Sequence, residues 1–326
     1  MSKETKNWTT NREFHILAFS NHAELKYVIF IGVLLMYIIT FLGNLVIISL
    51  ICMVSQLHTP MYFFLCNLSV QDIIYVSSIL PKMLTITITG DTNIDFSLCI
   101  TQMFLFMVCI VTEYLLLTSM AYDRYVAICI SLHYSLMMNK RTCVLLATAS
   151  WLIGILTSVM YSSIVSTLSF CKSQEINHFF CDLKAILNLS CSDITHIHTI
   201  IYIVAVFLGV IPFLMILSSY VNIISTIIKI KNTAGKLKIF SSCSSHLTVV
   251  ILFSVSPIIV YLKKDSEGFQ EPDKVLSLIY IAVIPMLNPL VYSLRNQDVL
   301  NALKKASGKI LLMTIHLLLD SDCCKK

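Results

Sequence analysis

The segment at residues 27–52, YVIFIGVLLMYIITFLGNLVIISLIC, decides the fold of this chain, because 26 successive positions hold no Asp, Glu, Lys or Arg. A helix needs about 20 predominantly apolar residues to cross the hydrocarbon core of a bilayer. The same rule predicts further spans at residues 60–85, 97–130, 143–168, 199–228, 238–262 and 274–294. The sequence therefore predicts an all-α membrane protein with a bundle of seven transmembrane helices.

The composition of the whole chain agrees with this interpretation. Of its 326 residues, 57% are hydrophobic and only 13% are charged. An ordinary soluble domain has about 25% charged residues. A water-soluble globule of this size cannot bury so much apolar surface, which argues against aqueous enzymes. The net charge is +5, and the basic residues form short clusters between apolar runs, which is not the pattern of a nucleic-acid-binding protein.

The positions of Lys and Arg predict the orientation in the membrane. With the N-terminus outside, thirteen basic and four acidic residues lie inside, and ten basic and twelve acidic residues lie outside. The net charge is then +9 inside and −2 outside, with Asp72 and Glu113 within the bundle. We therefore expect an extracellular tail at 1–26, the seven-helix domain at 27–294 and a cytoplasmic segment at 295–326.

Two further features agree with this orientation. Asn7-Trp8-Thr9 is an acceptor for N-glycosylation in the outer tail, and Asn188-Leu189-Ser190 is a second in the loop between spans four and five. Four of the twelve cysteines also fall on the outer side, where disulfides persist: Cys99, Cys171, Cys181 and Cys191. Four cysteines allow three pairings, and the sequence alone does not choose between them.

Acidic and amide side chains occur at mid-depth in the predicted spans, where a charge is costly. Asp72 lies midway along the second span and Glu113 midway along the third, and Asn44 and Asn288 lie at comparable depth in the first and seventh. These side chains can form one polar cluster in the centre of the bundle. Two alternatives remain open: a neutral hydrogen-bonded network with one or both acids protonated, or a bound sodium ion.

The run Met120 to Cys129, MAYDRYVAIC, lies near the inner end of the third span. Asp123 stands directly before Arg124 at the membrane edge, so the arginine can be neutralised locally in one state and released to another partner when helices separate. Pro289 removes a backbone hydrogen bond from the seventh span and makes that helix bendable. We interpret these features together as a conformational switch.

These motifs resemble those of the rhodopsin-like (class A) G-protein-coupled receptors and, within that class, the olfactory receptors. The resemblance covers about residues 20 to 305 and is carried by Gly43-Asn44, Leu57 to Leu65, Leu68 to Asp72, Met120 to Cys129, Phe170 to Cys191, Lys236 to Leu247 and Pro285 to Asn296. The stretches His58 to Tyr62 and Met120 to Tyr125 are close to diagnostic. The resemblance implies the disulfides Cys99–Cys181 and Cys171–Cys191, and a place in the plasma membrane.

The resemblance also implies how the switch works. The sixth span swings outward at its inner end, and the opened surface engages a heterotrimeric G protein of the stimulatory olfactory type, which raises cyclic AMP. The residues assigned to this switch are Asp123, Arg124, Tyr125, Tyr220, His246, Asn288, Pro289 and Tyr292. The basic stretches Lys140-Arg141 and Lys229 to Lys238 would face the G protein and anionic membrane lipid.

The outer half of the bundle is the predicted ligand-binding cavity. A climb of about 21–27 Å from Arg124 along a helix reaches Phe106, Met107 and Ile110. The family pattern adds facing residues from other spans: Val204, Leu208, Ser254, Ile258, Tyr261, Leu278 and Ile281. No Asp or Glu stands at the level of Phe106 to pair with an amine, and no Lys occurs midway in span seven to hold retinal. The expected ligand is a small, neutral and mainly apolar odorant.

Two segments depart from the family pattern or extend it. Olfactory receptors usually carry an aromatic residue after the phenylalanine of span six, and here Phe253 is followed by Ser254, which leaves more room in the cavity. The segment Ile310 to Leu319 is nearly all apolar but too short to span. We expect it to continue a short amphipathic eighth helix, Asn296 to Lys309, along the inner leaflet.

Other functions fit the sequence less well. A channel or transporter could use Asp72 and Glu113 as ion ligands, but the chain has no internal repeat of the kind that builds transporters. A class A receptor for a lipid or a peptide would not carry the olfactory motifs. No catalytic constellation is present. His196 and His198, two residues apart, do not face together on a helix, which argues against a metal site with Cys191.

Overall fold

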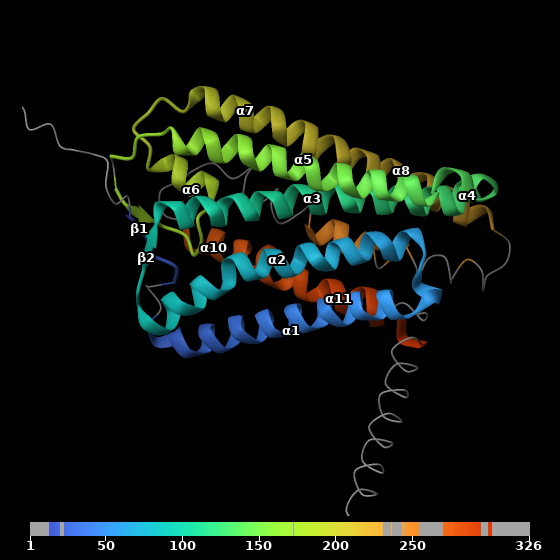
Figure 1. Ribbon diagram of the computed structural model, residues 1–326, viewed down its shortest axis with the longest axis horizontal. Helices are drawn as coiled ribbons and strands as arrows, with labels where there is room; N and C mark the ends of the chain where they lie inside the picture. Colours follow the sequence, from blue (N-terminus) through green and yellow to red (C-terminus); the bar gives the residue numbers. More distant parts are fainter. Residues whose placement is uncertain are drawn as a thin grey trace, which may run out of the picture.

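A computed structural model describes residues 13–19, 23–171, 173–230, 236, 243–244, 246–253, 270–294 and 299–301. Long helices lie side by side in it and form an elongated bundle (Figure 1). They are α1 (Lys26–Met53), α2 (Pro60–Thr89), α3 (Phe96–Cys129), α5 (Lys140–Ser166), and α7 (Thr195–Ala205) with α8 (Ile211–Lys229). A π-helical turn, η4 (Val206–Val210), joins α7 to α8 without a break.

Five helical segments among the described residues are long and apolar enough to cross a membrane, counting Thr195–Lys229 as one. They coincide with the first five predicted spans, and their ends differ from the prediction by a few residues. The seventh predicted span coincides with α10 (Gln270–Leu278), the π-helical turn η5 (Ile279–Val283) and α11 (Ile284–Leu294). Much of the sixth predicted span and the expected eighth helix lie outside the described residues.

The ends of several helices have local causes in the sequence. Pro60 occupies the first turn of α2, where its missing N–H costs nothing, and Gly90 ends that helix with φ 76°, a left-handed conformation that suits glycine. Asn139 caps α5 by accepting a hydrogen bond from the Thr142 backbone N–H at 3.0 Å. The Asp182 carboxylate likewise caps the short helix α6 (Leu183–Asn188).

Shorter elements connect these helices. They are η1 (Ala23–Leu25), η2 (Ser55–Leu57), η3 (Ser131–His133) and α4 (Tyr134–Met137). The helix α4 lies at one end of the bundle, and α6 lies at the other (Figure 1). We call the end of α3 that carries Cys99 the disulfide end, and the opposite end the Arg124 end.

The fold differs from the all-α prediction in a small sheet at the disulfide end (Figure 1). The strands β1 (Glu13–Ile16), β2 (Asn93–Asp95) and β3 (Glu175–Ile176) form a sheet with the order β2-β1-β3. The N-terminal strand β1 pairs antiparallel with β2 and parallel with β3. A segment predicted only as a tail is therefore the middle strand of a sheet that covers this end of the bundle.

Small residues let α5 approach α3 closely. Ala147, Ser150, Gly154 and Ser158 recur at helical spacing along one buried face of α5. Small side chains at a helix interface let backbones approach in membrane proteins, where packing rather than the hydrophobic effect drives association. The opposite face of α5 exposes large apolar residues such as Leu145 and Leu156, as expected of a helix that faces lipid.

Candidate functional site

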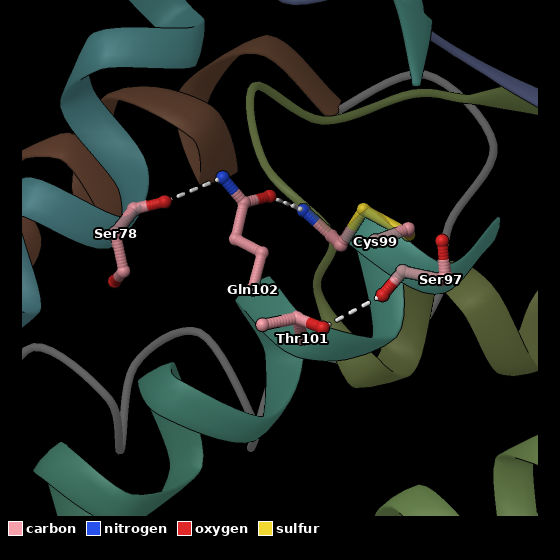
Figure 2. Close-up of a disulfide and its surroundings, with 6 residues drawn as sticks. Ser78, Ser97, Cys99, Thr101 and Gln102 are labelled. Atoms are coloured by element: carbon pink, nitrogen blue, oxygen red, sulfur yellow. Dashed lines mark hydrogen bonds between the residues drawn. A yellow bond between two sulfur atoms is a disulfide. The ribbon is translucent and has the colours of Figure 1, made fainter. Parts of the chain in front are cut away.

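Gln102 of α3 ties three parts of the disulfide end together. The Cys99–Cys181 disulfide joins the start of α3 to the loop after α5. Beside it, the Gln102 side-chain carbonyl accepts a hydrogen bond from the Cys181 backbone N–H at 2.9 Å, and its amide donates to the Ser78 backbone carbonyl of α2 at 2.9 Å. Figure 2 shows this bridge next to the disulfide. The loop is thus fixed to α3 covalently and to α2 through hydrogen bonds.

The second pairing implied by the resemblance is also formed. Cys171 and Cys191 are joined within the loop between α5 and α7, with Cα atoms 5.9 Å apart. An isolated β-bridge between Phe170 and Ser190 lies next to this disulfide. Because Cys191 is bonded to Cys171, its thiol is not free for a metal site with His196 and His198.

Phe106, the first predicted ligand contact, is fully buried in a stack of aromatic rings. Its ring centroid lies 4.7 Å from that of Phe180 in the loop and 5.7 Å from that of Tyr75 in α2. Phe180 continues to Phe179, and Phe179 to Phe19 of the N-terminal segment, with centroid distances of 5.2 and 5.9 Å. A row of rings therefore runs from the N-terminal segment to the predicted cavity.

The structure describes six of the other predicted ligand contacts, which lie in the third, fifth and seventh predicted spans. Ile281 in η5 is buried. Partly buried positions are Met107 and Ile110 of α3, Val204 of α7, Leu208 of η4 and Leu278 of α10. All of these side chains are apolar. Ser254, Ile258 and Tyr261, and also the glycosylation acceptor Asn7, lie outside the described residues.

The predicted polar cluster is buried in the centre of the bundle. Asp72 accepts a hydrogen bond from the Asn288 side-chain amide of α11 at 3.0 Å, and Glu113 accepts one from Gln71 at 3.2 Å. Asn44 donates to the Thr40 backbone carbonyl of its own helix at 3.0 Å. Gln71 was not predicted, because an amide beside Asp72 in the sequence carries no signal that it points at Glu113.

The oxygen atoms of this cluster fit a hard cation. One side-chain oxygen of each member is buried and has no hydrogen-bond donor among the described residues: Asn44 Oδ1, Gln71 Oε1, Asp72 Oδ1, Glu113 Oε1 and Asn288 Oδ1. Leaving buried acceptors unsatisfied costs free energy, and hard cations are bound by carboxylate and amide oxygens. The residues present could therefore hold a sodium ion.

At the Arg124 end, Asp123 has two partners. Arg124 Nε lies 3.7 Å from Asp123 Oδ2, and the Tyr134 hydroxyl of α4 donates to Asp123 Oδ1 at 2.8 Å. Burial and the Asp123 carboxylate raise the pKa of Tyr134, so its hydroxyl stays protonated and remains a donor. Arg124 also contacts the Met61 sulfur of α2. Tyr134 and Met61 were not among the predicted switch residues.

Tyr220 and His246, two of the predicted switch residues, are close together. The Tyr220 hydroxyl lies 2.6 Å from His246 Nδ1, and both side chains are buried. This contact ties α8 to the described segment 246–253, which belongs to the sixth predicted span. Near Arg124, the Cys129 sulfur of α3 lies 3.3 Å from the Thr226 hydroxyl of α8. The Asp123–Arg124 pair and the Tyr220–His246 pair of the predicted switch therefore lie toward the same end of the bundle.

The remaining predicted switch residues lie along α3 and α11. Tyr125 directly follows Arg124 in α3 and is partly buried, and Tyr292 belongs to the last turns of α11. Pro289 lies inside α11 and packs on α1: a Cβ atom added at Gly43 would lie 3.0 Å from the Pro289 ring. The seventh span therefore bends or shifts only if its contact with α1 adjusts.

A buried polar contact at the disulfide end was also missed. Lys274 in the middle of α10 is the first residue of the predicted seventh span and was given no role there, but it is only 2% exposed, and its ammonium donates to the Ala18 backbone carbonyl at 2.7 Å. His178 Nε2 lies 3.3 Å from the Ser277 hydroxyl one turn further along. Burial and the nearby Lys274 charge lower the pKa of His178 to about 3, so this imidazole is neutral at physiological pH.

The chain is similar to known proteins over most of its length. The family model described as olfactory receptor matches residues 33–309. Olfactory receptor 1G1 of Gorilla gorilla gorilla is 45% identical over 302 residues, which cover 93% of this chain and 96% of that protein. Olfactory receptor 13F1 of Homo sapiens is 46% identical over 299 residues, which cover 92% and 94%. Proteins of this family are receptors and not enzymes. The chain therefore belongs to the olfactory receptor family of G-protein-coupled receptors and is a multi-pass membrane protein that functions as an odorant receptor.

Proposed function

We propose that this receptor binds small, neutral, mainly apolar odorants at the disulfide end of the bundle and activates a stimulatory olfactory-type G protein, which raises cyclic AMP. The carrying observation is the Tyr220–His246 hydrogen bond of 2.6 Å beside Asp123 and Arg124. It closes the sixth span onto α8 in this state. An odorant shifts the population toward an open state only by its difference in affinity for the two states.

The apolar character of the candidate ligand contacts supports the ligand class. Phe106 and the other described lining residues carry no charge, so affinity comes mainly from buried apolar area, at about 25 cal/mol per Å². Micromolar binding with modest selectivity is the expected result.

The distribution of disulfides and charge supports the orientation. Both disulfides lie at one end, which we assign to the extracellular side, where disulfides persist. The N-terminus is then extracellular, seven spans cross the plasma membrane, and the C-terminal segment with its eighth helix is cytoplasmic. Antibody access to a tag at each terminus, measured in intact and in permeabilised cells, tests this assignment: two tags on the same side would contradict it.

A cyclic AMP reporter assay tests the proposed function. Cells co-express the receptor with an olfactory-type G protein and are screened against a panel of neutral volatile molecules, with amines and carboxylic acids as the comparison set. Neutral compounds should give the responses. Arg124→Ala should abolish them at equal surface amount, and Phe106→Asp should weaken them, because a buried carboxylate repels an apolar ligand. Wild-type responses from both variants would refute the assignment of switch and cavity.

We further propose that the polar cluster binds a sodium ion that favours the closed state. Asp72 and Glu113 supply the charge, and Asn44, Gln71 and Asn288 supply neutral oxygens. Replacing sodium with N-methylglucamine in the assay medium should raise odorant potency in the wild type. Asp72→Asn with Glu113→Gln should remove this dependence. Equal sodium dependence in the wild type and the double variant would contradict the site.

A further inference from the structure

The N-terminal segment 13–19 holds the sheet at the disulfide end together. The strand β1 is its middle strand, so β2 and β3, which belong to different loops, are joined through it. Ile16 N–H donates to the Thr92 carbonyl at 2.9 Å on one side, and His15 N–H donates to the Gln174 carbonyl at 2.8 Å on the other. The segment is therefore bonded along both edges.

The inner face of this segment is packed against the bundle. Phe14, Ile16 and Ala18 are buried, and the Phe14 ring lies 5.9 Å from the Phe96 ring at the start of α3 and 5.4 Å from the Phe170 ring. Alternate residues of a strand face the same side, which explains why Phe14 and Ile16 are buried together, whereas Ala18 lies in a turn beyond the strand.

The far end of the segment is fixed to the seventh span. The Ala18 backbone carbonyl accepts the hydrogen bond from Lys274, and its N–H donates to the His178 carbonyl at 3.0 Å. Ala18 has φ 44°, a left-handed conformation that costs free energy in a residue other than glycine. The surrounding contacts must hold the backbone there, and the Lys274 ammonium is a charged, buried donor among them.

The same segment is connected through aromatic rings to Phe106, one of the side chains assigned to the odorant. Phe19 stacks on Phe179, which packs on Phe180, and Phe180 packs on Phe106 of the predicted cavity. Lifting the segment away would uncover this row of rings from its outer end.

We propose that residues 13–19 form a lid over the odorant cavity; this proposal rests on the ligand site of the proposed function. The hydrogen bond from Lys274 holds the lid to the seventh span and thereby limits the rate of ligand exchange. Lys274 is a positioning residue in this proposal: it touches the lid and not the odorant.

Cysteine labelling of intact cells with a membrane-impermeant maleimide tests the lid without a known odorant. Outer cysteines that the structure describes are paired in disulfides, so the reagent reports an added cysteine. Ile16→Cys reports opening of the lid itself. Leu278→Cys, one helical turn below Lys274, reports access to the cavity.

Lys274→Met should raise the labelling rate of both cysteines about tenfold, the equivalent of about 1.4 kcal/mol, the scale of one hydrogen bond from a charged group. Lys274→Arg should restore slow labelling. Lys82→Met is the control: the partly buried Lys82 ammonium also donates to a backbone carbonyl, that of Asn93 in β2, and this hydrogen bond does not involve residues 13–19. It should leave both rates unchanged.

An engineered disulfide that holds the lid closed gives a second test, which remains available if Lys274→Met does not reach the cell surface. His15 and Asn93 are partners across β1 and β2, at a separation that a disulfide spans. His15→Cys with Asn93→Cys should slow labelling of Leu278→Cys below the wild-type rate. If Leu278→Cys is labelled at the wild-type rate both with Lys274→Met and with the His15→Cys, Asn93→Cys pair, the lid proposal is overturned. Loss of cyclic AMP responses alone would overturn only the proposed function.

Discussion

Replacing Gly154 with alanine should destabilise the receptor, because no space exists for a methyl group where α5 crosses α3. A Cβ atom at this position would lie 2.6 Å from Thr112 Oγ1 and 2.9 Å from the Val108 backbone carbonyl oxygen. The Thr112 side chain can rotate away, but the Val108 carbonyl is part of the α3 backbone. The two helices must therefore move apart along a tightly packed face.

The expected cost follows from two opposing effects. Overpacking of a close-packed interior costs about 1–3 kcal/mol. Removing a glycine from the middle of a helix returns about 0.5–1 kcal/mol. From the middle of each range, the net destabilisation should be about 1 kcal/mol, which corresponds to a fall of about 2–4 °C in the unfolding midpoint. Thr112→Ala in the Gly154→Ala background should recover part of this loss, because it removes one of the two clashes.

Thermal unfolding of the detergent-solubilised receptor measures this effect with a thiol-reactive fluorophore, which reports exposure of the buried thiols Cys109 and Cys143. Gly32→Ala in α1 is the matched control, because a Cβ atom there meets nothing within 4 Å. Its midpoint should equal or exceed the wild-type midpoint. A midpoint of Gly154→Ala equal to that of Gly32→Ala would refute the close approach of α3 and α5.

Two further predictions concern the ends of the bundle. Acidification from pH 7 to pH 5 should destabilise the folded disulfide end by about 2 kcal/mol. The pKa of His178 is about 6.5 in the unfolded chain and about 3 in the folded protein, so the unfolded chain binds a proton first. The stability that is present above pH 6.5 is therefore lost as the pH falls. His178→Asn should lose less stability over the same pH range in the thermal assay; an equal loss in both proteins would contradict the burial of this imidazole. Tyr134→Phe should raise ligand-free cyclic AMP severalfold at equal surface amount, because Asp123 loses the donor that helps hold it in the closed state. Tyr122→Phe serves as the control, and equal basal signals from the two variants would argue against a role of Tyr134 in the switch.

The long helices could be predicted because each depends on a continuous local signal. The run at 27–52 needs only its own apolar length to cross a bilayer, and the structure places α1 at Lys26–Met53. The start of α2 at Pro60 was likewise visible in the sequence. The meeting of Tyr220 with His246 followed from the family resemblance and not from spacing.

The sheet at the disulfide end could not be predicted, because strand pairing is set by partners far away in the sequence. The strand Glu13–Ile16 has only four residues, and its partners lie about 80 and 160 positions further on. The burial of Lys274 depends on the same distant contact. Gln71 is similar: its sequence neighbours give no sign that its amide reaches Glu113 across to α3.

The π-helical turns η4 and η5 have a consequence for how this receptor can vary. Such a turn accommodates one residue more than a regular α-helix, so the side chains before it are rotated by about 100° relative to those after it. Leu208 and Ile281 sit within these turns. Loss of a single residue there would re-aim the half of the fifth or the seventh helix that lies toward the disulfide end, while the half toward the Arg124 end kept its place. Odorant preference could thus change through helix rotation alone, with every lining side chain conserved in identity.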